Sequence, residues 1–341
     1  MISALDVTDD AAGREAFHAV VASAYEGQPR GTTPDRVAVE RSLDRDIYRS
    51  RQRLFVAFDG DRPVARIVAR IAPQLNDARG NPYGLLGFFE SARNVDTGRA
   101  LFQPAIDWLR GHGVGAIVGP MDGDTWHRYR VNIGPFDHPP FPLEPWNPPY
   151  YRELWEQAGF GEVESYSSKW IDDVTVLLPR LESGAERAAS HGICVRALDR
   201  SRLDQELAIV HRLSAEIFRD AFLYSPITLP DFLDMYRGVE RFLDPDLVVF
   251  ATAPDGRDVG FVFAYADPSL PAIHYKTIGV LSDWRKAGTT AALSRHVYRN
   301  AVARGLRAGN HALMRDDNRS QALDAGLGVV FRRYVLFGRD A

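Results

Sequence analysis

The order of predicted strands and helices repeats in the two halves of the chain, and this repeat restricts the fold more than any other feature. The first half begins with a strand at 2–7 and an amphipathic helix at 11–25. It continues with strands around a helix at 97–112, and the same order starts again at 193. Such an alternation is typical of a mixed sheet covered by helices. We therefore expect an α/β (α+β) fold of two mixed-sheet modules in tandem.

The boundaries of the two modules follow from the repeat. The predicted parts are a first module at 1–171, a linker at 172–192 and a second module at 193–341. The linker is polar and rich in small residues, which is typical of a connecting segment. Each module contains two strands joined by a tight turn, and the second module is also predicted to have two short helices. The hairpins are expected at 54–71 and 247–266, and the helices at 231–242 and 320–327.

The net charge and the lengths of the apolar runs argue against two classes of partner, although local basic patches remain possible. With a formal net charge of −4 over 341 residues, the chain lacks the basic excess of proteins that bind nucleic acid without sequence preference. No apolar run reaches the roughly 18 residues that a membrane-spanning helix needs. We therefore expect a globular protein with neither nucleic-acid nor membrane partners.

The single cysteine indicates a reducing compartment. One thiol, Cys194, cannot form an intrachain disulfide, and its apolar neighbours Ile193 and Val195 predict a core position. The first residues also lack the basic and then apolar order of a signal peptide. These observations favour a cytoplasmic location.

One turn in the second module is predicted to bind anions. An apolar strand ends near Val280, a helix-compatible run starts at Ala291, and the turn between them contains Gly288. Glycine permits close approach to the backbone, and the first amides of a helix have no partners within it. The helix dipole favours a phosphate at such a place, and Arg285 and Lys286 can add charged contacts.

The segment 285–290, Arg-Lys-Ala-Gly-Thr-Thr, resembles the pyrophosphate-binding turn of the GNAT superfamily of N-acetyltransferases, which hold coenzyme A. The family pattern is Gln/Arg-x-x-Gly-x-Gly/Ala. Arg285 and Gly288 match it, whereas Thr290 replaces the last small residue. Both modules also close like GNAT domains, with an asparagine, here Asn318, followed by a Gly and an aromatic residue near the last strand. The resemblance covers nearly the whole chain and implies a tandem GNAT protein.

The resemblance implies that acetyl-CoA or another acyl-CoA binds to the second module. Backbone N–H groups near the end of the strand would contact the thioester oxygen, and the turn would hold the pyrophosphate. The cofactor-binding residues predicted in this way are Ile278, Val280, Arg285, Lys286, Ala287, Gly288, Thr289, Thr290 and Asn318. Alignment of the halves places Asp96 opposite Gly288, and a carboxylate repels phosphate. We therefore expect the turn of the first module to be degenerate.

Direct acyl transfer to an amine needs a proton acceptor, a donor to the thioester oxygen and an acid for the leaving thiolate. In GNAT enzymes the acid is often a tyrosine seven positions after the asparagine. Here that position is Ala325, and Tyr334 on the last strand is the candidate substitute. The alternative is that Tyr334 is an ordinary strand aromatic that packs in the core. For the proton acceptor we predict His274 or Tyr275, which alternate between the two faces of one strand, or His311 on its neighbour. A structural, hydrogen-bonded role is the alternative for each histidine.

A long loop in the first module is the predicted site for the acceptor substrate. It mixes aromatic surface with cationic donors, which suits a molecule with a carboxylate or phosphate and an apolar body. The residues are Trp126, His127, Arg128, Tyr129 and Arg130. Simple packing of this loop is the alternative. Asp122 and Asp124 lack further oxygen ligands at defined spacing, so no metal is expected.

Together these features predict an N-acyltransferase that moves an acetyl or other acyl group from acyl-CoA directly to an amine of a small molecule. Two alternatives stay open. The donor could be the thioester of an acyl carrier protein, which depends less on tight binding at the pyrophosphate turn and so tolerates Thr290. The chain could also be a degenerate GNAT-like module that binds a ligand or partner without turnover.

Overall fold

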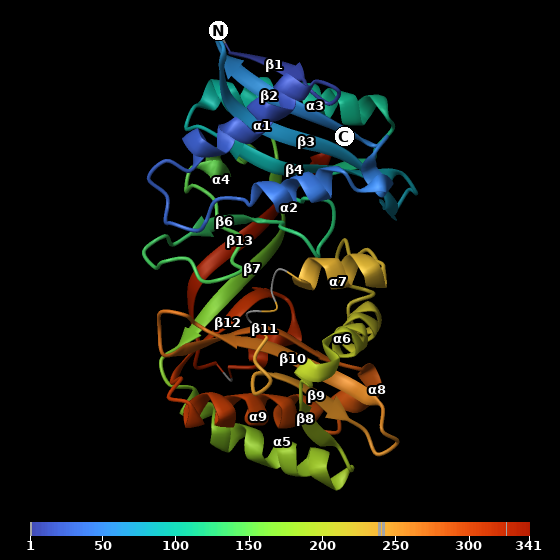
Figure 1. Cartoon of the computed structure of the whole chain (residues 1–341), viewed down its shortest axis with the longest axis vertical. Coiled ribbons are helices and arrows are strands. Elements are labelled where there is room, and N and C mark those ends of the chain that lie inside the picture. Colours follow the sequence, from blue (N-terminus) through green and yellow to red (C-terminus); the bar gives the residue numbers. More distant parts are fainter. Residues whose placement is uncertain (1, 238–239, 241–242, 325) are drawn as a thin grey trace. The chain divides into compact units, whose positions relative to one another are not determined.

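The computed structural model describes residues 2–237, 240, 243–324 and 326–341, which form helices covering mixed β-sheet (Figure 1). The chain divides into two compact units. Unit 1 comprises Met1–Ser165 together with Arg332–Ala341, and unit 2 comprises Tyr166–Phe331. The predicted mixed α/β fold is confirmed. The predicted second module, at 193–341, included the last strand, but the structure assigns residues 332–341 to unit 1.

Unit 1 is built on a mixed sheet whose strands follow the order β1-β2-β3-β4-β5-β13, with β6 also paired to β13. Among the described residues, its strand pairs are antiparallel except β4 with β5. The predicted hairpin at 54–71 is confirmed as β2 and β3. The strands are β1 (Ile2–Asp6), β2 (Gln52–Asp59), β3 (Arg62–Asn76), β4 (Pro82–Ser91), β5 (Ala116–Gly119), β6 (Val131–Gly134) and β13 (Val329–Asp340).

Helices cover both faces of this sheet (Figure 1). One face packs against α3, and Trp155 of α4 joins the same core, where it contacts Phe89 and Phe102 edge to face. The other face packs against α1, which buries Phe17 and Val20 beneath it. The helices are α1 (Ala11–Ala24), α2 (Arg36–Leu43), the 3-10 helix η1 (Asp46–Tyr48), α3 (Val95–Gly111) and α4 (Tyr151–Gln157). The pattern did not predict α2.

Unit 2 contains strands in the order β7-β12-β11-β10-β9-β8. The strand pairs described in this unit are antiparallel except β11 with β12, and the predicted hairpin at 247–266 is confirmed as β9 and β10. Cys194 is exposed at the start of β8, so its predicted core position is wrong. The strands are β7 (Gly161–Ile171), β8 (Cys194–Ala197), β9 (Val248–Thr252), β10 (Asp258–Ala266), β11 (Ala272–Val280) and β12 (Ala308–Arg315).

The predicted linker at 172–192 contains a helix. This helix, α5, lies beside α9 (Figure 1), and its small residues Gly184, Ala185 and Ala188 are buried. The helices of unit 2 are η2 (Val174–Leu177), α5 (Leu178–Ser190), η3 (Arg200–Arg202), α6 (Leu203–Ile217), α7 (Leu229–Arg237), α8 (Ser282–Arg285), α9 (Thr289–Ala303) and η5 (Arg319–Ala322).

Two predicted helices of unit 2 differ from the structure. The helix expected at 231–242 is α7 as far as Arg237, and positions 238–239 and 241–242 lie outside the described residues. The helix expected at 320–327 is only the short 3-10 helix η5 within the described residues. No helix in the described ranges has both the length and the apolar character needed to cross a bilayer.

Candidate functional site

The two parallel strands in unit 2 separate after a short paired stretch. β11 and β12 pair from Ala272 with Ala308 to Tyr275 with His311, and the pairing ends there. Beyond this point, within the described part of the chain, β11 remains paired only with β10, and β12 only with β7. Lys276 forms a bulge, because its neighbours Tyr275 and Thr277 oppose consecutive residues of β10. The divergence thus follows directly on a bulge in β11.

The predicted anion-binding turn follows β11. Gly288 has a φ of 90° and stands at the N-cap of α9, where no side chain caps the helix within the described part of the chain. Arg285 donates from Nε to the Val280 carbonyl at 2.9 Å, and both Arg285 and Lys286 are exposed. The Thr289 hydroxyl donates to the Trp284 carbonyl at 2.7 Å. The amides of the first turn of α9, together with the basic rim, suit an anion.

The glycine of this turn also serves helix packing. A Cβ atom at Gly288 would lie 2.1 Å from the Gly184 carbonyl oxygen of α5. Ala287 and Thr289 are buried beside it, whereas Thr290 is half-buried. Helix α5 therefore makes the close backbone approach that the glycine permits.

The other predicted cofactor-binding residues lie on β11 or further along the chain. Val280 is buried and Ile278 is half-buried on β11, in the stretch where β12 has separated. Asn318 caps η5 by accepting from the Ser320 amide at 3.4 Å. Ala325, the position where the family often has its acid, lies outside the described residues.

Buried polar side chains lie on both faces of the sheet at the end of the β11–β12 pairing. On one face the His274 Nε2 atom contacts Asp267 Oδ2 at 2.7 Å, and its Nδ1 atom lies 3.0 Å from the Asn310 amide nitrogen. This contact pattern makes Nδ1 the acceptor and leaves the ring proton on Nε2. His274 is therefore held between a carboxylate and an amide.

The opposite face carries the other two predicted proton acceptors. The Tyr275 hydroxyl lies 2.8 Å from Ser294 Oγ, and the Tyr298 hydroxyl lies 2.5 Å from His311 Nε2. Since Ser294 and Tyr298 belong to α9, Tyr275 and His311 point to the helix-covered face. The predicted alternation of His274 and Tyr275 between the faces therefore matches the structure.

Burial changes the protonation of several of these groups. Burial lowers the pKa of the His311 imidazole to about 4, so this side chain is neutral at pH 7. Burial likewise raises the pKa of Tyr275 well above its ordinary value. Although burial acts to raise the pKa of Asp267, its hydrogen bonds from His274 and backbone amides lower it overall. An ionised Asp267 can therefore stabilise a proton on His274.

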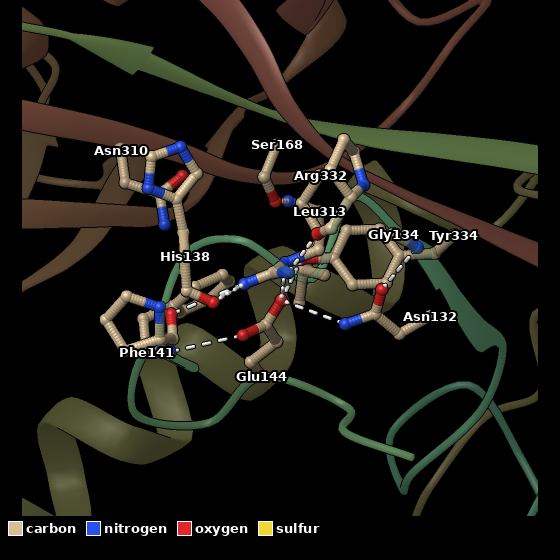
Figure 2. Close-up of polar contacts among 12 residues, drawn as sticks. Asn132, Gly134, His138, Phe141, Glu144, Ser168, Asn310, Leu313, Arg332 and Tyr334 are labelled. Atoms are coloured by element: carbon tan, nitrogen blue, oxygen red, sulfur yellow. Dashed lines mark hydrogen bonds and ion pairs between the residues drawn. The ribbon is translucent and has the colours of Figure 1, made fainter. Parts of the chain in front are cut away.

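Tyr334, the predicted acid, belongs to unit 1 and is fully buried. Figure 2 shows the Glu144 carboxylate facing Arg332, Tyr334 and Asn132. The Tyr334 hydroxyl donates to Glu144 Oε1 at 2.6 Å, and Arg332 donates to the same oxygen at 3.0 Å. Burial raises the pKa of Glu144 to about 6, although Arg332 and Tyr334 act to lower it. The sequence analysis did not identify Glu144, and its only signal was a carboxylate within a Pro-rich apolar loop.

In unit 1 the strands that correspond to β11 and β12 remain joined. The β4–β5 pairing ends at Leu85 with Val118, but the Met121 amide then donates to the Leu86 carbonyl at 2.9 Å. Phe88, with a φ of 52°, donates its amide to Asp122 Oδ1 at 2.5 Å. The segment after β5 therefore occupies the edge of β4 that the corresponding strand leaves open in unit 2.

Much of the predicted acceptor loop is engaged within unit 1. Arg128 donates to Glu90 at 2.7 Å, and His127 contacts Asp124 at 2.6 Å. The guanidinium of Arg130 lies 3.9 Å from the centre of the Tyr129 ring. Trp126 and Tyr129 are half-buried. The side chains of His127 and Arg128 thus both contact carboxylates of the protein itself.

The carboxylates of this loop have protein partners as well. Asp124 accepts from Arg45 at 3.1 Å, and Asp122 lies 3.5 Å from Arg128 Nε. Over the described ranges, no three His, Cys, Asp or Glu side chains are grouped so that they could hold a metal ion.

Comparison with known proteins identifies the fold. No family model matches the chain. A solved tandem GNAT protein from the clavulanic acid biosynthesis pathway superposes with a TM-score of 0.56 at 16% identity, covering 100% of this chain and 98% of its own. The protein has the fold of tandem GCN5-related N-acetyltransferases, as the resemblance implied.

Two curated proteins are related in sequence. The chain is 27% identical over 212 residues, 61% of its length, to the bacterial ceramide synthase of Caulobacter vibrioides. It is 23% identical over 258 residues, 73% of its length, to Protein YghO of Escherichia coli. The matched regions span only 54% and 64% of the lengths of these two relatives.

Proposed function

We propose that this protein is an N-acyltransferase whose unit 2 transfers an acyl group from acyl-CoA to an amine. The observation that carries the proposal is the divergence of β11 and β12 directly after the bulge at Lys276. An opening between parallel strands exposes backbone groups of β11 to a ligand that lies along it. Unit 1 has the corresponding edge of β4 occupied by its own segment around Met121, which favours unit 2 as the donor site.

The donor would bind from the strand to the turn. Backbone N–H groups near Ile278 and Val280 would donate to the thioester oxygen, where negative charge develops during transfer. The pyrophosphate would lie at the first turn of α9, with Arg285 and Lys286 at its exposed side. Coenzyme A when bound supplies the activated acyl group as a thioester.

The transfer step needs one proton acceptor. The amine nitrogen attacks the thioester carbonyl carbon, so that the C–N bond forms and the C–S bond breaks. The proton that the nitrogen loses passes through the proton acceptor to the departing sulfur, which leaves as the thiol. We assign proton acceptance to Nδ1 of His274, because Asp267 at 2.7 Å from Nε2 would stabilise the protonated form. The Asn310 amide, which donates to Nδ1 in this structure, would turn its oxygen toward the new N–H. Tyr275 and His311 are bonded to side chains of α9, so we assign them a supporting role. We assign no step to Tyr334.

The sequence relative suggests an acceptor class. Ceramide is an amide of a fatty acid with a long-chain amino alcohol, and the relative from Caulobacter vibrioides is named for its synthesis. We therefore include long-chain amino alcohols, with hydrophilic amines and amino acids, among the acceptors to be tested. Long-chain and acetyl thioesters are the donors to be compared.

The test combines binding with turnover. Titration calorimetry should show saturable binding of acyl-CoA, weakened at least about 10-fold by Lys286→Ala, since a charge-assisted contact is lost. Arg257→Ala, which removes an exposed arginine elsewhere in unit 2, should bind like the parent chain. Thiol release in the presence of a productive amine should fall about 100-fold in His274→Asn. Normal turnover by that variant would refute the assigned base, and failure of every acyl-CoA to bind would refute the donor.

A carrier-protein thioester is the second candidate donor. The packing of Gly184 of α5 against Gly288 favours it, because the backbone approach at the glycine is already taken. A phosphopantetheine arm on a carrier protein lacks the adenosine part of the coenzyme, so this turn does not have to bind a pyrophosphate. Turnover with acyl carrier protein but not with acyl-CoA would select this donor. Binding without release from either donor would select a GNAT-like binding protein.

A further inference from the structure

A pocket of about 280 Å³ lies in unit 2, with walls from α5, from α9 and from the segment of β8 (Figure 1). Its volume is close to the lower end of the range of about 300–1,000 Å³ that is usual for small-molecule sites. In the strand order, β9 and β10 separate β8 from β11. The pocket is therefore distinct from the opening between β11 and β12.

The lining of this pocket combines apolar and basic side chains. The apolar part comes mainly from α5 and the segment of β8, and it includes Ala185, Ala189 and Ile193. The basic part comes from α9, where Arg295 and Arg299 are one helical turn apart and both line the pocket. Among the described residues, no carboxylate belongs to the lining.

Arg295 presents an unpaired and accessible edge to this pocket. Its side chain is 25% exposed, and its Nη1 atom donates to Glu182 Oε1 at 2.5 Å. Within the described part of the chain, its Nε and Nη2 atoms have no hydrogen-bond partner, and both remain open to solvent. These two atoms form the edge of a guanidinium that binds an oxyanion with two parallel hydrogen bonds.

The charge around the pocket favours an anion. Glu182 also accepts from Arg299 at 3.4 Å, so one carboxylate serves two guanidinium groups and the three side chains keep a net charge of about +1. Asp246, another carboxylate near this part of α9, lies 4.0 Å from Arg304 and does not line the pocket. A ligand in the pocket thus meets cationic groups and no carboxylate of the lining.

His296 adds a further donor to the same lining. Its ring is half-buried, and in the described ranges neither ring nitrogen forms a hydrogen bond. Burial lowers the pKa of His296, so at pH 7 the ring is neutral and carries one N–H donor. A phosphate group has three terminal oxygens and can accept from the imidazole and from the Arg295 edge together, whereas a carboxylate has only two.

We propose that this pocket binds a phosphate monoester with a small apolar body, its phosphate held by Arg295, His296 and Arg299. The apolar body would contact the wall at Ala185 and Ile193. The site does not use the residues proposed for acyl transfer. Its ligand would therefore bind whether or not the chain turns over an acyl donor.

The test uses phenyl phosphate against the intact chain in titration calorimetry at pH 7, with phenol and phenylacetate as controls of similar size. Phenyl phosphate should bind saturably, and Arg295→Gln should weaken it about 10–100-fold, because a charged pair of hydrogen bonds is lost. Arg304→Gln removes an arginine just beyond α9 that does not line the pocket, and it should leave binding unchanged. Phenol or phenylacetate that binds as tightly as phenyl phosphate would overturn the proposal.

Lys286→Ala separates this site from the turn before α9, which could also attract a phosphate. Binding of phenyl phosphate should be unchanged in Lys286→Ala and weakened in Arg295→Gln. Binding that is weakened in Lys286→Ala and kept in Arg295→Gln would place the phosphate at the turn and overturn the proposal. Because no thioester is present, failure of acyl-CoA to bind would leave this result unaffected.

A variant in the apolar wall tests the pocket with its basic residues intact. Ala189 is exposed on α5 and lines the pocket, so Ala189→Phe should occupy the space of the apolar body without disturbing the core. This variant should lose binding of phenyl phosphate at least about 10-fold, since the wall then overlaps the ligand. Unchanged binding in Ala189→Phe would count against the pocket as the site.

Discussion

Acid should destabilise this protein through His311. The imidazole is only 1% exposed on β12, and burial lowers its pKa from 6.5 to about 4. Between these values the unfolded chain holds a proton at His311 that the folded chain does not. The stability that this difference provides is therefore complete above pH 6.5 and is lost as the pH falls toward 4. A difference of 2.5 pKa units corresponds to about 3.4 kcal/mol in full, of which about 2 kcal/mol is lost between pH 7 and pH 5.

The variant that isolates this effect is His311→Gln. Its carboxamide can form a hydrogen bond with the Tyr298 hydroxyl, which lies 2.5 Å from the imidazole Nε2, but it cannot gain a charge. Urea unfolding at pH 7 and pH 5 should show the parent chain losing about 2 kcal/mol more than the variant. His191→Gln, which replaces an exposed histidine of unit 2, should behave like the parent chain. Equal losses in the parent chain and in His311→Gln would refute the argument from burial.

Three further predictions concern single side chains. Burial raises the pKa of Glu144 from 4.5 to about 6, so the stability that protonated Glu144 contributes is present below pH 4.5 and is lost as the pH rises through 6. Urea unfolding at pH 4.5 and pH 7 should therefore show the parent chain losing about 2 kcal/mol more than Glu144→Gln. Gly288→Ala should cost about 3 kcal/mol or more because its Cβ would clash with α5, whereas Gly305→Ala, at a φ of 79° with open space around it, should cost about 1 kcal/mol. Thermal unfolding of the two variants compares them, and equal costs would contradict the packing argument. Asp122→Ala should cost about 2–3 kcal/mol by removing the acceptor for the buried Phe88 amide, and Asp122→Asn should recover part of this loss in the same assay.

Local patterns predicted the strands other than β6, and most helices, because their signals lie in adjacent residues. The hairpins at 54–71 and 247–266 were recognisable from short apolar runs on either side of a polar turn. The helix α5 was not recognised, because its buried face consists of small residues, including Gly184, that are also typical of connectors. The small residues of α5 are explained only by its packing against α9, because close contact between two helices requires small side chains.

The candidate site was predicted in part. The turn before α9 and the alternation of His274 and Tyr275 follow from local sequence, and the structure has both. The position of Tyr334 could not be predicted, because strand order across a sheet depends on contacts between distant residues. Arg128 was predicted to face a substrate, but its partner Glu90 lies 38 positions away in the sequence. Sequence reasoning identified the cation and missed the carboxylate that holds it.

The assignment of residues 332–341 to unit 1 has a consequence for synthesis on the ribosome. β13 covers β5 through pairs such as Phe337 with Gly119, so β5 is an uncovered sheet edge until these residues are made. All of unit 2 is translated in the meantime, which takes roughly 10–30 s at about 5–20 residues per second. The nascent first unit must therefore avoid aggregation during this delay. Chaperones that bind exposed strands would bind β5 at Ile117 and Val118.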